Sequence, residues 1–126
     1  MKDQDLFIKE LIDLFPSLEE ELLDEDYRAS ITFQMGSFKR FMQEAIAKND
    51  GDKFDAMVDF LRKNLPLVEK RVQNAIYLNF FGKLDFSENL DLRKCLGQHL
   101  GKAYTDIENY NNSPARDKVK NFLNKF

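Results

Sequence analysis

Residues that break helices are scarce in this chain. Five glycines and three prolines occur among its 126 residues, and these are the two poorest helix formers. Apolar residues recur at i, i+3, i+4 and i+7, the spacing that places them on one face of a helix. With 43% hydrophobic and 33% charged residues, the chain has material for one core and a charged surface. We therefore predict a single all-α domain spanning residues 1–126, with six or seven helices packed as antiparallel helical hairpins.

The first half of the chain has the pattern of four helices. We expect them at about residues 4–15, 18–26, 31–48 and 52–64. Pro16 ends the first, and Ser17 with Glu20 forms a capping box at the start of the second. The turn sequence Asn49-Asp50-Gly51 separates the last two, with Gly51 in the left-handed conformation that closes a helix. These two helices are therefore predicted to form an antiparallel hairpin.

The second half has the pattern of two or three more helices. Pro66 suits the first turn of a helix over 66–84. Another helix covers about 92–103, and the sequence leaves open whether it continues through Gly97 and Gly101 or ends at the second glycine. Residues 109–114 have loop composition. A final helix after them is expected to pack on the core through Val119, Phe122, Leu123 and Phe126.

The charge is distributed unevenly along the chain. The chain as a whole carries −3, but residues 1–27 contain ten acids and two lysines, a net −8, and the remainder carries +5. Such a run is commonly just a solvated helix face, although it also attracts a basic partner. Our candidate partner-binding residues are the acids of this run from 19 onward: Glu19, Glu20, Glu21, Asp24, Glu25 and Asp26.

One group of residues has side chains suited to catalysis or metal binding. Asp91, Cys95 and His99 stand at i, i+4 and i+8. A single helix spreads three such side chains too far apart to hold one ion, and no other Cys or His exists in the chain, so we predict no metal site. The leucines at 92, 96 and 100 suggest that Cys95 is a small apolar core residue and that His99 lies at the core boundary. We expect no cofactor and no enzymatic activity.

The remaining signals concern other partners and the compartment. Arg62, Lys63, Lys70 and Arg71 flank Pro66, and Lys39 with Arg40 forms a smaller basic cluster. Without a phosphate loop or a nucleic-acid-binding motif, these favour a solvated face over nucleic-acid binding. The lone cysteine fits a reducing compartment, and neither a secretory signal nor an apolar run of about 18 residues is present. We expect a cytoplasmic protein that does not bind a membrane.

Several segments resemble a known family. They are ITFQMGSFKRF at 31–41, Phe60-Leu61 and VQNAIYLNFF at 72–81, together with Leu14-Phe15-Pro16. Over about residues 6–104 the chain is similar to a family of small, all-helical, uncharacterised bacterial domains. In that family an acidic residue commonly follows the aromatic-rich end of the fifth helix, where this chain has Gly82. The resemblance implies a helical fold and a bacterial source, and it carries no activity.

These observations favour a non-enzymatic protein-binding module that uses the acidic residues 19–26. Similar small acidic helical proteins often act as immunity partners of toxins, so an immunity-like role is the specific form of this hypothesis. One alternative is an enzyme or small-ligand binder with a pocket between the helices at 66–84 and 92–103, using Cys95 and His99. The other is a structural oligomerisation unit, in which Tyr77, Leu78 and Phe81 widen the apolar surface shared between copies.

Overall fold

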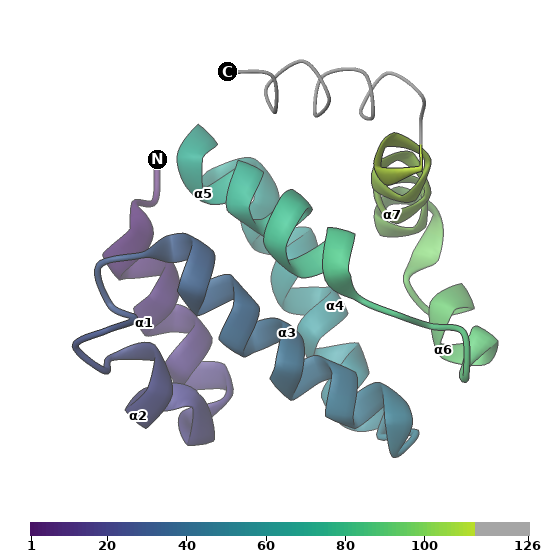
Figure 1. Cartoon of the computed structure of the whole chain (residues 1–126), viewed down its shortest axis with the longest axis horizontal. Helices are drawn as coiled ribbons and strands as arrows, with labels where there is room; N and C mark the ends of the chain where they lie inside the picture. Colours follow the sequence, from purple (N-terminus) through teal and green to yellow (C-terminus); the bar gives the residue numbers. More distant parts are fainter. Residues whose placement is uncertain (113–126) are drawn as a thin grey trace, which may run out of the picture.

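Helices form all the regular elements of residues 1–112, the part of the chain that the computed structural model describes. The all-α prediction is confirmed. Figure 1 shows α1 and α2 at one end of the molecule, α6 and α7 at the other, and the remaining helices between them. Their bounds are α1 (Gln4–Leu14), α2 (Glu19–Leu22), α3 (Ile31–Ala47), α4 (Gly51–Asn64), α5 (Lys70–Ala75), α6 (Leu90–Lys94) and α7 (Gly97–Asn111). None of these helices in the described part combines the length and apolar character needed to cross a bilayer.

The hairpin of α3 and α4 forms the centre of the core. The Ser30 hydroxyl caps α3 by accepting a hydrogen bond from the Phe33 backbone amide. The Asp50 carboxylate caps α4 in the same way, by accepting one from the Lys53 backbone amide. Phe38 of α3 stacks on Phe80, with ring centroids 4.2 Å apart. The apolar residues along one face of α4 and at its C-cap are all buried: Phe54, Met57, Val58, Leu61 and Leu65.

The turn between these two helices differs in detail from the expectation. Asn49, with φ +55°, adopts the left-handed conformation, and Gly51 is the first residue of α4. Asparagine tolerates this region better than other residues that carry a Cβ. The left-handed residue that closes α3 therefore lies two positions earlier than predicted.

The short helix after Pro16 is smaller than predicted. Residues Pro16–Leu18 form a 3₁₀ turn, α2 ends at Leu22 instead of continuing to residue 26, and a series of turns follows it. The expected capping box of Ser17 and Glu20 does not form, because Leu18 occupies the N-cap position with no side-chain bond. Leu23, the residue that follows α2, is 46% exposed.

The helix predicted over 66–84 is divided. Pro66 lies in a 3₁₀ turn (Leu65–Leu67), and α5 begins at Lys70. Lys2, near the start of the chain, causes this division. Its backbone amide donates a hydrogen bond to the Leu67 carbonyl at 2.7 Å, and its carbonyl accepts one from the Glu69 amide at 2.8 Å. This parallel bridge holds Val68 extended and excludes it from a helix.

Beyond α5 the helical turn of the backbone first becomes wider and then narrower than in an α-helix. Ile76–Phe80 is a π turn and Phe81–Lys83 a 3₁₀ turn. Both Phe80 and Phe81 are buried there. Gly82 lets α7 approach, since a Cβ at this position would lie 3.1 Å from Ile107 Cγ2 and 3.3 Å from Asn111 Nδ2.

The last described helices break at Gly97, with φ +79°, and not at Gly101. Residues 109–111, predicted as loop, extend α7. The final helix predicted after residue 113 lies outside the described residues.

Candidate functional site

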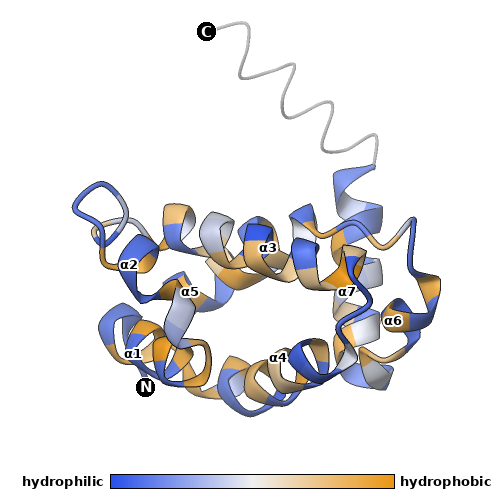
Figure 2. Ribbon diagram, turned by 90° about the horizontal axis from the view of Figure 1, so that it is seen from below, coloured by the Kyte–Doolittle hydropathy of each residue, from blue (hydrophilic) through white to orange (hydrophobic). Residues whose placement is uncertain are grey.

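The six acidic side chains between 19 and 26 are all exposed. They lie on α2 and on the turns that follow it, which Figure 2 colours as hydrophilic at one end of the molecule. Glu21 forms an ion pair with Arg40, and this hydrogen bond raises the pKa of Arg40. The other five have no ion-pair partner within residues 1–112. The surface therefore presents uncompensated negative charge, as the sequence predicted, with Glu21 as the exception.

A groove of about 700 Å³ runs between α1 and this acidic segment. One face of α1 forms the first wall, with residues Asp5, Ile8, Lys9, Ile12 and Asp13. The other side and the base are formed by Glu19, Leu23, Arg28, Ala29 and Gln34. We call this feature the α1 groove.

The lining of the α1 groove is partly apolar and partly charged. Ile8 is buried, Ile12 is half-buried, and Leu23 contributes an exposed apolar side chain. The charged lining residues are all exposed, three acids and two bases. An open groove of this composition resembles an interface with an apolar centre and a polar rim.

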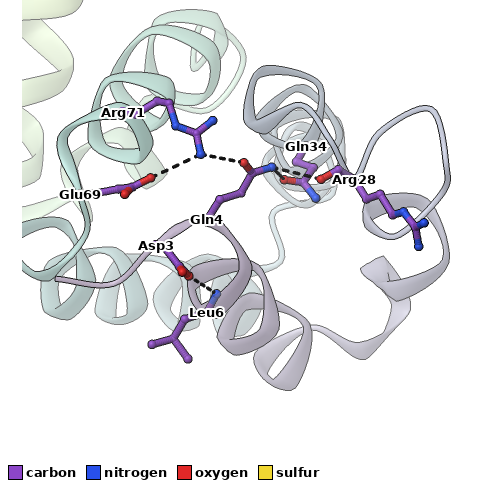
Figure 3. Close-up of polar contacts among 7 residues, drawn as sticks. All are labelled: Asp3, Gln4, Leu6, Arg28, Gln34, Glu69 and Arg71. Atoms are coloured by element: carbon purple, nitrogen blue, oxygen red, sulfur yellow. Dashed lines mark hydrogen bonds and ion pairs between the residues drawn. The ribbon is translucent and has the colours of Figure 1, made fainter.

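A buried hydrogen-bond network fixes the outer wall of the groove (Figure 3). The Gln4 amide donates to the Gln34 side-chain oxygen at 2.8 Å and to the Arg28 carbonyl at 3.2 Å. The Gln34 amide donates to the Leu22 carbonyl at 2.9 Å. Arg71 of α5 donates to the Gln4 side-chain oxygen at 3.0 Å. The segment 22–28 is thus attached to α1 and α3 near both of its ends.

Sequence analysis missed these two glutamines, although a signal for them exists. Gln4 precedes Phe7 and Ile8 by three and four positions, whereas Gln34 follows Ile31 by three positions and precedes Phe38 by four. Both therefore lie on faces that are otherwise apolar. The structure buries both, leaving Gln34 only 2% exposed, and buried polar side chains require hydrogen-bond partners.

A smaller hollow of about 200 Å³ lies on α3 beside the same turn. Tyr27 and Phe33 form part of its lining, with ring centroids 6.0 Å apart, and Asp26 and Arg40 contribute charges. Phe33 is 58% exposed, the largest exposure of any aromatic residue in the described part. The acidic segment is therefore bordered by exposed apolar surface at Leu23 and at Phe33.

The residues with catalytic potential lie at the opposite end of the molecule. Asp91, Cys95 and His99 are all exposed, so the predicted burial of Cys95 and the core-boundary position of His99 are wrong. The reason is Gly97, whose left-handed conformation ends α6 and places Cys95 and His99 on either side of the break. Neither side chain lines the two hollows found near α6 and α7. Within residues 1–112, no three His, Cys, Asp or Glu side chains gather where they could hold a metal ion.

The apolar surface predicted after α5 is smaller than the sequence indicated. Of the residues expected to widen it, Leu78 is exposed, whereas Tyr77 is half-buried and Phe81 is 1% exposed. The basic residues around Pro66 are all exposed, in agreement with the solvated face that the sequence favoured, and one of them, Arg71, also binds Gln4 and Glu69.

Comparison with known proteins gives one match. A family model described as "Domain of unknown function (DUF7674)" matches residues 8–112. No curated protein matches the chain, and no solved structure does so either.

Proposed function

The chain therefore belongs to the DUF7674 family, and because that family has no known function, we propose from the site alone that the protein is a protein-binding module with a basic partner. One observation carries this proposal: Glu19, Glu20, Asp24, Glu25 and Asp26 are exposed and form no ion pair within residues 1–112, and Glu19 also lines the partly apolar α1 groove. Charge attracts the partner and speeds association, while apolar contact supplies affinity.

We extend this proposal to an immunity-like role in a bacterium. In that role the acidic surface covers a basic region of a toxin and keeps it from its target. The support is the combination of a small helical fold and an acidic surface at one end of the molecule. A cytoplasmic location fits this role.

Charge reversal tests the proposed surface. Glu20, Asp24 and Glu25 are replaced together by lysine, which leaves the Glu21–Arg40 pair intact. The matched control replaces three exposed acids elsewhere, Asp55, Glu88 and Asp91, so that the net charge changes equally. Both variants and the wild type are used for affinity capture from a lysate of the source organism, followed by mass spectrometry and by affinity measurement with each captured protein.

We expect a basic partner that the wild type and the control retain and the first variant loses. If both variants retain it with unchanged affinity, the acidic residues 19–26 are not its binding surface. If both lose it equally, net charge and not this surface determines the interaction.

A further inference from the structure

The α1 groove has the shape and composition of a site for one particular kind of ligand. We infer that it binds an amphipathic helix of the partner, with apolar side chains against Ile8, Ile12 and Leu23 and with lysine or arginine side chains toward the acidic edges. This inference rests on the proposed function and specifies which structural element of the partner is recognised.

The geometry of α1 supports a helical ligand. The residues of α1 that line the groove stand at 5, 8, 9, 12 and 13, so they form one continuous face over about two helical turns, a length of about 12 Å. A helix lying along this face presents its own residues at i, i+3 or i+4 and i+7 to the base of the groove. The wall at Leu23–Ala29 lies on the other side and makes the site a channel between two edges.

The arrangement of charges supports a basic ligand. Asp5 and Asp13 stand at the two ends of the α1 wall, and Glu19 stands on the opposite edge. The remaining acids of residues 20–26 follow Glu19 along the chain and are all exposed. Lys9 and Arg28 are the two cations of the lining, and the acids of the groove and the adjoining segment outnumber them. A neutral apolar helix would leave these acids without compensation, whereas a basic one pairs with them.

The exposure of the lining favours a peptide over a small molecule. Only Ile8 and Gln34 are buried and Ile12 is half-buried, while the other seven lining residues are exposed. Sites for small molecules bury most of the ligand surface, which an open channel does not do. The outer wall is nevertheless fixed in place, because the Gln4–Gln34 network holds the carbonyls of Leu22 and Arg28. A preformed channel costs little to order when a helix binds.

The test uses two synthetic peptides as probes. One is a dye-labelled peptide of leucine and lysine with leucines at i, i+3, i+4 and i+7, and the other has the same composition in scrambled order. Fluorescence anisotropy measures their affinity for the full chain. We expect the amphipathic peptide to bind at least about tenfold more tightly than the scrambled one, because only a continuous apolar face fills the groove.

Two matched variants locate the binding site. Leu23→Ser removes an apolar side chain from the groove wall, and Leu90→Ser removes one at the opposite end of the molecule. These leucines are 46% and 59% exposed, so both variants are expected to fold, which circular dichroism checks. We expect Leu23→Ser to weaken binding of the amphipathic peptide about tenfold and Leu90→Ser to leave it unchanged.

The remaining outcomes overturn the inference. Absent binding, equal binding of both peptides, or equal effects of the two leucine variants would each show that the groove does not recognise a basic amphipathic helix. If sedimentation shows that the chain self-associates and that Leu23→Ser abolishes this, the occupant is a second copy. If charge reversal at 20, 24 and 25 abolishes partner capture while Leu23→Ser leaves partner affinity unchanged, the proposed function stands and the groove inference fails.

Discussion

The side chain of Gln34 connects three parts of the structure from inside the protein. It accepts a hydrogen bond from Gln4 at 2.8 Å and donates one to the Leu22 carbonyl at 2.9 Å. At 2% exposure, water does not replace either partner. This residue therefore determines where the wall of the α1 groove lies relative to α1.

We predict that Gln34→Leu destabilises the protein by about 1–3 kcal/mol, because the Leu22 carbonyl loses the bond from Gln34 and the Gln4 side-chain amide loses one of its two acceptors. Urea unfolding measures the change. Gln98→Leu is the control, since Gln98 is exposed and its replacement is expected to stay within about 0.5 kcal/mol of wild type. Equal stability of the two variants would mean that the network contributes nothing measurable.

Tyr104 is expected to make the stability of the folded protein pH-dependent in the alkaline range. Its hydroxyl donates to the Leu84 carbonyl at 2.9 Å, and burial raises the pKa of Tyr104 above its ordinary value of 10.0. The folded state therefore favours the neutral phenol. Its contribution is fully present below pH 10 and is lost as the pH rises through the pKa of the folded state.

We predict that Tyr104→Phe lowers stability by about 0.5–1.5 kcal/mol at neutral pH, through loss of one hydrogen bond. The difference from wild type should shrink above about pH 10, where the wild-type phenol itself ionises. Urea unfolding of both proteins across this range is the measurement. A difference that stays constant with pH would show that Tyr104 titrates alike in the folded and unfolded states.

At the scale of helices, Gly97 separates α6 from α7. Its φ of +79° suits glycine, and a residue with a Cβ is less stable there by about 1–2 kcal/mol. Gly101, four residues later, lies inside α7, and a Cβ added there would have no neighbouring atom of the described residues within 4 Å. Alanine in a helix interior is about 0.5–1 kcal/mol better than glycine.

We therefore predict opposite signs for two alanine substitutions in one helix. Gly97→Ala is expected to destabilise the protein by about 1–2 kcal/mol, and Gly101→Ala to stabilise it by about 0.5–1 kcal/mol. Thermal unfolding followed by circular dichroism gives both values. Stabilisation by Gly97→Ala would indicate that α6 and α7 join into one helix in solution.

The helices show what local patterns predict and what they miss. The stripes of α3 and α4 were predictable because each of those helices is long, capped and amphipathic. The division of the segment 66–84 was not predictable from its own sequence. It depends on backbone hydrogen bonds between Lys2 and residues 67 and 69, and a local pattern does not report a partner more than 60 positions away. At Gly97 and Gly101 the sequence offered two possible breaks, and tertiary packing selected the first.

At the scale of the molecule, the acidic surface was predictable but the groove was not. Exposure of the six acids between 19 and 26 follows from their charge, because such side chains are almost never buried without partners. The groove depends on where the turn after α2 lies relative to α1. That position is set by hydrogen bonds from Gln4 to Arg28 and from Gln34 to Leu22, which link separate elements.

Among the described residues, negative charge is concentrated at one end of the molecule. Residues 1–27 carry −8, whereas residues 28–112 carry +2 and residues 90–112 carry no net charge. Figure 1 places α1 and α2 at the end opposite α6 and α7. A basic ligand is therefore drawn to the end that carries the α1 groove, over distances comparable to the Debye length. Salt shortens that length and weakens the attraction before contact, whereas apolar contacts in the groove are little affected by moderate salt.

We predict that the association rate of the basic amphipathic peptide falls about tenfold between roughly 0.02 M and 0.5 M salt, while its dissociation rate changes much less. Stopped-flow anisotropy separates the two rates. The variant with lysine at 20, 24 and 25 should show a slower and less salt-dependent association, and the control with lysine at 55, 88 and 91 should stay closer to wild type. If the two variants respond alike, net charge and not its position beside the groove governs the encounter.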